Sequence, residues 1–214
     1  GVNYIGFTTC PACPAPANFA AANITTTTVD FSWDASAGGN SYNIEWGSPG
    51  FTPGTGAEDG SITGSTNLME TATGLVAQTN YHAYIQADCG STSGWAGPLV
   101  FATPCNPFIA PFLETFTTTS TPACWSQSAS AGGPWVFTGD PGYTASGVLD
   151  HTNGSSNNYA WIDHSLTDVS VILETPNIDV SALTSPELRF WIWSHYSGNL
   201  SPYNPTHIEA WNGS

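Results

Sequence analysis

Short runs in which apolar and polar residues alternate are the feature that most constrains the fold of this chain. The clearest runs are residues 29–33, 42–46, 81–87 and 99–101, and turn residues such as Gly, Asn and Ser separate them. A period of two places one face of a strand on a core and the other in water, as in an antiparallel sheet. Because helical periodicity is nearly absent, the pattern predicts an all-β fold of antiparallel β-sandwiches.

A change of composition after residues 103–107 (Thr-Pro-Cys-Asn-Pro) divides the chain, and the second half is richer in Trp. With 214 residues the chain is long enough for two cores of ordinary size. We therefore expect one domain over 13–105 and a second over 106–214. The clearest expected strands of the second domain are residues 148–150, 159–163, 169–173 and 188–193.

Residues 1–12 are expected to be the tail of a preceding module or a linker. The run Phe7-Thr8-Thr9-Cys10 resembles residues 101–105, which also end an extended segment before prolines. An ordinary N-terminal strand accounts for the same similarity equally well.

The charge of the chain excludes several classes of partner. Arg189 is the single basic residue against 16 acidic ones, which gives a formal net charge of −15. Nucleic-acid binding requires cations that neutralise phosphates, and docking on an anionic membrane requires them too. No run of eighteen apolar residues occurs, so we expect no membrane insertion. Aromatic residues make up 13% of the chain, which favours packed cores over disorder.

The five cysteines favour disulfides in an oxidising compartment, and therefore a secreted or cell-surface protein. They are Cys10, Cys13, Cys89, Cys105 and Cys124. Cys10 and Cys13 have the C-x-x-C spacing of redox and zinc sites. The prolines around them prevent the helix that a redox motif opens, and no second C-x-x-C supplies further zinc ligands.

Residues 13–105 resemble a fibronectin type III domain. Residues 14–19 and 29–33 resemble its strands A and B, and Trp33 stands at the family's core tryptophan. Leu75, six residues before Tyr81, resembles the turn into strand F that carries a tyrosine corner. The resemblance implies a seven-stranded sandwich.

The same resemblance implies one disulfide. In a fibronectin-like sandwich strand A starts at the pole where strand F ends, which makes Cys13 and Cys89 neighbours. Cys105 follows strand G at the opposite pole, about 20 Å away, so a Cys89–Cys105 bond is excluded. The alternative is that Cys10, three residues from Cys13, bonds to Cys89 instead.

The second half resembles MAM domains, which occur in meprins, neuropilins and receptor tyrosine phosphatases. The resemblance rests on residues 112–116, 123–127, 133–135, 150–152, 159–163, 174–176 and 188–191. Arg189 falls on the family's arginine, whereas two of its cysteines and its last strands do not occur in this sequence. A related resemblance is to the cleaved-adhesin jelly rolls of secreted bacterial proteins, and the combination looks typical of Bacteroidetes surface proteins. Both imply a jelly-roll β-sandwich.

The MAM resemblance also implies a second disulfide and a metal site. Cys105 takes the place of a missing family cysteine and pairs with Cys124, which leaves Cys10 for an upstream module. Glu114, Asp150 and Asp163 form a carboxylate set for a structural calcium ion, which prefers oxygen ligands. The alternative is that these are turn and edge acids that accept backbone hydrogen bonds.

No catalytic residues are expected, and the chain is not expected to be an enzyme. The five histidines are His82, His151, His164, His195 and His207, and no Gly-x-Ser-x-Gly or His-Glu-x-x-His motif accompanies them. Asp150 and His151 are adjacent and would point to opposite faces of a strand.

The tryptophans are expected to lie mostly in cores. Trp191 and Trp193 share one strand face, which is typical of core residues, whereas Trp95 and Trp135 are better placed for exposure. Stacking on sugar rings is the alternative role. The sequons at Asn23, Asn153, Asn199 and Asn212 matter only in a eukaryotic secretory route.

Two functions remain. The first is a non-catalytic segment of a large extracellular protein, which serves adhesion or acts as a spacer and contacts an extracellular protein, a glycan or neighbouring modules of the same chain. The second is an accessory ligand- or carbohydrate-binding region of a secreted hydrolase or peptidase. The fold alone does not choose between them.

Overall fold

The computed structural model of the protein divides into two units, Gly1–Asn106 and Pro107–Ser214. The described residues are 13–130, 133–138, 149–152, 159–162, 170–193 and 206–210. The expected domain boundary, between residues 105 and 106, lies one residue before this division. No helix occurs in the described ranges, and so no helix there is long and apolar enough to cross a membrane.

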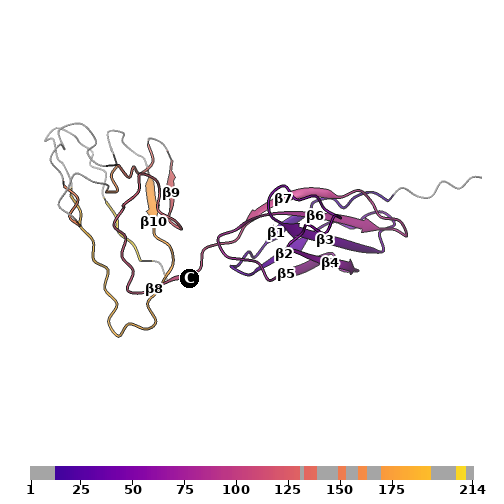
Figure 1. Ribbon diagram of the computed structural model, residues 1–214, viewed down its shortest axis with the longest axis horizontal. Helices are drawn as coiled ribbons and strands as arrows, with labels where there is room; N and C mark the ends of the chain where they lie inside the picture. Colours follow the sequence, from indigo (N-terminus) through magenta and orange to yellow (C-terminus); the bar gives the residue numbers. More distant parts are fainter. Residues whose placement is uncertain are drawn as a thin grey trace, which may run out of the picture. The chain divides into compact units, whose positions relative to one another are not determined.

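The first unit is a sandwich of two antiparallel sheets (Figure 1). Its strands are β1 (Ala20–Ala22), β2 (Thr28–Ser32), β3 (Ser41–Gly47), β4 (Gly60–Ser65), β5 (Met69–Thr73), β6 (Asn80–Asp88) and β7 (Ala96–Ala102). One sheet has the order β1-β2-β5 and the other the order β4-β3-β6-β7. The predicted all-β sandwich with seven strands is therefore confirmed for this unit.

The strand positions follow the alternating runs closely. Strands β3, β6 and β7 contain three of the four runs of the sequence, and β2 contains the fourth up to Ser32. Strand β1 begins after the segment 14–19 in which strand A was expected, and β4 lies between the runs 42–46 and 81–87, where no strand was expected. Strand β4 reads Gly-Ser-Ile-Thr-Gly-Ser, and its single apolar residue gives no visible alternation. It forms because β3 supplies a neighbouring edge.

Aromatic residues on the inner faces form the core between the two sheets. Phe31 on β2 is fully buried and has ring centroids at 5.3 Å from Phe19, 6.2 Å from Trp46 on β3 and 5.7 Å from Phe101 on β7. Trp33 is 4% exposed, which confirms its predicted core position. The strictly alternating burial of β2 and β6 brings these side chains to one layer.

The predicted tyrosine corner is present before β6. Leu75 and Tyr81 are both buried, and the backbone N–H of Val76 donates a hydrogen bond of 2.9 Å to the Tyr81 hydroxyl. The ring of Tyr81 stacks on Phe101 at 5.4 Å. The corner therefore joins the turn before β6 to the aromatic core.

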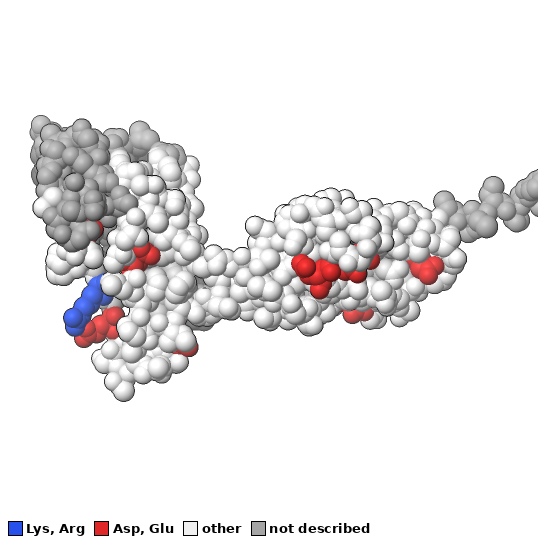
Figure 2. Space-filling model, viewed as in Figure 1, with Lys and Arg blue, Asp and Glu red and all other residues white. Residues whose placement is uncertain are grey.

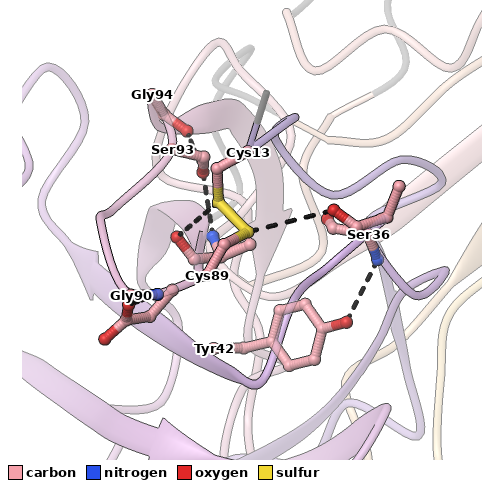
Figure 3. The surroundings of a disulfide bond; sticks show 10 residues. Cys13, Ser36, Tyr42, Cys89, Gly90, Ser93 and Gly94 are labelled. Atoms are coloured by element: carbon pink, nitrogen blue, oxygen red, sulfur yellow. Dashed lines mark hydrogen bonds between the residues drawn. A yellow bond between two sulfur atoms is a disulfide. The ribbon is translucent and has the colours of Figure 1, made fainter. Parts of the chain in front are cut away.

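A disulfide joins Cys13 to Cys89, as the fibronectin resemblance implied (Figure 3). The two Cα atoms are 5.8 Å apart although the residues are separated by 76 positions. Cys105 and Cys124 are also disulfide-bonded, and their pairing with each other stays a prediction. Cys10 lies outside the described residues.

The second unit contains short strands around a smaller aromatic cluster. Its strands are β8 (Phe108–Ile109), β9 (Ser126–Ala129), β10 (Val171–Glu174) and β11 (Ile178–Asp179). Strands β9 and β10 pair antiparallel, and β8 and β11 pair parallel. Phe116 packs against Trp125 at 5.4 Å and against the buried Phe137 at 5.8 Å. This unit is all-β in its described ranges, and its jelly-roll topology stays a prediction.

Several predictions for the second unit are wrong. The described residues of the expected strands 148–150 and 159–163 form no strand, apart from an isolated bridge between Trp161 and Val136. Residues 188–193 form no strand, and Trp191 and Trp193 are 74% and 54% exposed rather than part of a core. The run is rich in apolar residues, but a strand needs a partner whose backbone groups pair with its own. Within the described ranges no segment pairs with residues 188–193, and their apolar side chains are at least half exposed.

We expect Gly60→Ala to destabilise the first unit. Gly60 is the cross-strand partner of Trp46, and an added Cβ would lie only 2.6 Å from Cε2 of the buried indole. Trp46 would have to shift within the core, at a cost of about 1–3 kcal/mol, measured as the free energy of unfolding in denaturant.

Gly94→Ala is the matched control, since nothing lies within 4 Å of its added Cβ, and it should leave the stability nearly unchanged. In the variant Trp46→Phe the smaller ring gives room, so Gly60→Ala should cost less there than in the natural chain. Equal costs in both backgrounds would contradict the proposed clash.

Candidate functional site

Two of the three proposed calcium ligands lie in the described ranges, and each accepts a local backbone hydrogen bond. Glu114 Oε1 accepts from the N–H of Phe116 at 2.6 Å, and Asp150 Oδ1 accepts from the N–H of Thr152 at 2.8 Å. These are the contacts expected of turn acids. Asp163 lies outside the described residues. No group of three or more His, Cys, Asp or Glu side chains that could hold a metal occurs in the described ranges.

One feature of Asp150 still favours a cation. Its side chain is buried, with 7% of the residue exposed, and an ionised carboxylate is costly to bury without a partner of opposite charge. The salt bridge of the described part of the chain joins Arg189 to Glu187, on exposed side chains (Figure 2). Calcium binding at Asp150 therefore remains a proposal that these residues motivate.

The described histidines occupy different environments. His82 on β6 accepts a hydrogen bond from the N–H of Gly50 through Nδ1, at 3.2 Å. The ring of His151 stacks on Trp191 with centroids 3.5 Å apart, and His207 is exposed. His164 and His195 lie outside the described residues. His82 and His151 thus have contacts that position a loop and an indole ring.

Aromatic side chains of the second unit present an exposed apolar segment. Phe190, Trp191 and Trp193 are all at least half exposed, and Trp191 lies against the His151 ring. Trp135 is half-buried, and Trp161 donates through Nε1 to Thr138 Oγ1 at 3.3 Å. The segment 190–193 is therefore the described surface best suited to stack on a flat apolar ligand.

Carboxylates of the first unit are held by neutral donors, because the chain's one basic residue lies in the other unit. The hydroxyl of Thr71 and the amide of Asn23 donate to Asp30, and these hydrogen bonds lower the pKa of its carboxyl. The hydroxyl of Ser65 and the amide of Asn67 lower the pKa of Glu70 in the same way. Figure 2 shows acidic side chains gathered over the middle of this unit.

Hydrogen bonds at the last strand fix the point where the chain leaves the first unit. Thr103 is buried; its hydroxyl donates to the Val76 carbonyl at 2.6 Å and accepts from the N–H of Thr79 at 3.0 Å. The N–H of Gln78 donates to the Pro104 carbonyl at 3.0 Å. Thr103 was not among the residues predicted to be functional, although a threonine directly after an expected strand and before Pro-Cys was a visible signal.

A scan against protein-family models finds no match, and a search of curated proteins finds no relative. Among solved structures, the fibronectin type III domain of human collagen alpha-1(XX) is 22% identical, with 46% of this chain and 92% of that chain covered and a TM-score of 0.38. The FN5 domain of Drosophila Lar is 19% identical, with 44% and 100% covered and a TM-score of 0.36. A myokine structure is 19% identical, with 44% and 99% covered and a TM-score of 0.37. Each of these likenesses concerns less than half of this chain, and none transfers a function to it.

We expect Thr71→Val to raise the pKa of Asp30 toward its usual 3.8, since the hydroxyl of Thr71 is the main cause of its lowering. A carboxyl whose pKa is lowered by folding stabilises the fold above its unfolded value, and this contribution is lost as the pH falls through the lowered value. The difference in melting temperature between the natural chain and Thr71→Val should therefore shrink below about pH 3.8.

Carboxyl NMR titration measures the pKa directly. Thr73→Val is the matched control, because Thr73 lies on the same strand but pairs with Thr28 rather than Asp30. If Thr71→Val leaves the Asp30 pKa unchanged, or if Thr73→Val raises it equally, the assigned cause is wrong.

Calcium should raise the melting temperature of the second unit if Asp150 is a ligand. A tenfold excess of calcium over its Kd stabilises the bound state by about 1.4 kcal/mol, or roughly 6–11 °C for a domain of about 100 residues. Asp150→Asn keeps the oxygen that accepts from Thr152 and removes the charge, so it should abolish the shift. Asp179→Asn is the control, since Asp179 also caps a turn, at Ser181. Unchanged melting on chelation would rule out the site.

Proposed function

We propose that this chain is a non-catalytic segment of a large extracellular or cell-surface protein, in which it serves as a structural spacer or adhesion unit. Its partners are neighbouring modules of the same chain, or an extracellular protein or glycan. The proposal concerns what the first unit does mechanically, and it rests on where the chain enters and leaves that unit.

The entry and exit points lie at opposite ends of β6, and this observation carries the proposal. Cys13, at the entry, is bonded to Cys89, directly after the end of β6. Thr103 and Pro104, at the exit, are hydrogen-bonded to Thr79 and Gln78, directly before its start. The nine residues of β6 span about 30 Å. In Figure 1 the chain correspondingly reaches this unit at one end and leaves it at the other. Such a unit adds length to a chain of modules.

Both ends are fastened to β6 by interactions that resist separation. At the entry a covalent bond holds Cys13, and disulfides persist in oxidising compartments outside the cytosol. At the exit, the buried hydroxyl of Thr103 makes two hydrogen bonds to the turn before β6. Tension applied through the chain would therefore be transmitted along β6. This supports a location in secreted or surface-attached protein.

The second candidate function is an accessory ligand- or carbohydrate-binding region of a secreted hydrolase or peptidase. The exposed aromatic segment 190–193 and the stacked pair of His151 and Trp191 favour it. Exposed indole and imidazole rings provide flat surfaces on which a sugar ring can stack.

Single-molecule stretching of the full chain tests the spacer proposal. With the Cys13–Cys89 disulfide intact, tension cannot extend the intervening chain, which spans 76 positions. The variant Cys13→Ser/Cys89→Ser should therefore unfold with a contour length about 260 Å greater, at ~3.4 Å per residue. If the variant does not fold, reductant added to the stretched natural chain should release a step of the same length.

Equal contour lengths for the oxidised chain and the serine variant would contradict the spacer proposal, because no covalent bond would then hold the entry point to β6.

A glycan array with the natural chain and Trp191→Ala tests the second candidate function. Glycan binding that Trp191→Ala removes would establish the second function instead.

A further inference from the structure

The loop between β3 and β4, residues 48–59, lies across the outer face of the four-stranded sheet, and we call it the strap. Gly47 shows how closely the strap lies on the sheet. A Cβ added there would be 3.2 Å from Cδ1 of Phe51 and 3.3 Å from Cα of Glu58. The N–H of Asp59 donates to the Trp46 carbonyl at 2.8 Å and closes the strap at its far end.

Three contacts attach the strap to side chains of the sheet. The N–H of Gly50 donates to Nδ1 of His82 at 3.2 Å, and the N–H of Gly54 donates to Oε2 of Glu45 at 2.7 Å. The ring of Phe51 meets Tyr84 edge to face at 5.2 Å. Gly50 and Gly54 have φ values of 89° and 77°, in the left-handed region that favours glycine. Glycine at positions 50 and 54 therefore allows the backbone conformations in which these two N–H groups donate.

The two hydrogen bonds respond differently to acid. The Gly50 bond requires Nδ1 of His82 to be an acceptor, which occurs only in the neutral imidazole with its proton on Nε2. In the protonated ring both nitrogens carry hydrogen. The N–H at Nδ1 then faces the N–H of Gly50, and two donors cannot form a hydrogen bond with each other. The Glu45 carboxylate accepts from Gly54 without any such change. Protonation of His82 thus breaks one attachment and leaves the other.

We propose that the strap is a pH-sensitive element, attached at Gly50 when His82 is neutral and released there when His82 is protonated. Histidine is the side chain whose charge normally changes between about pH 5 and 8. Glu45 on β3 and Tyr84 and Asp88 on β6 are the titratable groups on the same face of the sheet as His82, and Glu58 and Asp59 are those of the strap. Strand β7 places Val100 opposite His82 and has no titratable side chain.

Release of the strap would change the outer surface of the sheet. Phe51 covers the edge of Tyr84, and a Cβ added at Gly54 would lie 3.4 Å from Nε1 of the half-buried Trp95. When the Gly50 attachment is lost, the part of the strap that carries Phe51 is free to move away from Tyr84, while Gly54 stays bonded to Glu45 beside Trp95. The ring of Tyr84 on the outer face of β6 then becomes more accessible in mild acid.

Hydrogen exchange of the Gly50 amide, followed by NMR on the full chain between pH 8 and pH 5, tests the proposal. Rates are expressed as protection factors, which remove the intrinsic pH dependence of exchange. We expect the Gly50 protection factor to fall about two- to tenfold as the pH decreases, the range that corresponds to one hydrogen bond. The core amides of Phe31 and Ile85 should keep their protection and so report that the fold is intact.

Three variants identify the group that titrates. His82→Asn offers an amide oxygen near the position of Nδ1 but carries no charge, so Gly50 protection should stay high at every pH. His82→Phe has no acceptor, so protection should stay low at every pH. Glu45→Gln keeps an acceptor for Gly54, so the response at Gly50 should match the natural chain. The proposal is overturned if the natural chain shows no change, or if His82→Asn shows the same fall.

Discussion

The contact of Phe31 with aromatic rings from both sheets is the interaction on which the first unit depends. Phe31 is fully buried on β2, and the rings of Trp46 and Phe101 reach it from the opposite sheet. A ring in this position joins two sheets that share no backbone hydrogen bonds. Aromatic burial contributes large apolar area and preferred edge contacts, which makes it the main source of cohesion between the layers. Gly60, opposite Trp46, is part of this packing, because the indole of Trp46 occupies the space that a side chain at position 60 would need.

The near absence of basic residues explains how the polar groups of this unit are arranged. Asp30, Glu45 and Glu70 accept hydrogen bonds from hydroxyls, amides or backbone N–H groups, where lysines or arginines would serve in an ordinary domain. Neutral donors hold a carboxylate in place without cancelling its charge. The fold therefore retains the negative charge of these carboxylates.

Sequence alone predicted the elements whose signals are local. The alternating runs gave β2, β3, β6 and β7, and the spacing of Leu75 and Tyr81 gave the tyrosine corner. The Cys13–Cys89 disulfide followed from a resemblance that fixed which strand ends meet. Strand β4 was missed, because an edge strand with a single isoleucine forms through its neighbour rather than through its own pattern. The strap contacts of His82 were missed for the same reason, since they depend on where a glycine-rich loop folds.

The second unit shows where prediction from local sequence patterns fails. As a strand, residues 188–193 would place Trp191 and Trp193 on one face, yet no partner strand covers them in the described ranges. Periodicity states which face a strand would bury, but it does not supply the surface that receives it. The proposed calcium ligands illustrate this too, because Glu114 and Asp150 first satisfy their own turns. A resemblance can name residues of a site without bringing them together.

Strand β6 connects the core, the two ends of the first unit and the strap. Its inner residues Tyr81, Ala83, Ile85 and Ala87 are buried, while His82 and Tyr84 on the outer face hold the strap. The disulfide is formed by Cys89, directly after its last residue. The backbone hydrogen bond of Thr103 is made to Thr79, directly before its first residue. A shift of one residue in its pairing would exchange its two faces. It would place His82 in the aromatic core and remove the strap's acceptor. The tyrosine corner and the disulfide, one at each end of β6, oppose such a shift because both act on residues fixed in register. The features that support a spacer and those that support a pH-sensitive strap therefore depend on the register of this one strand.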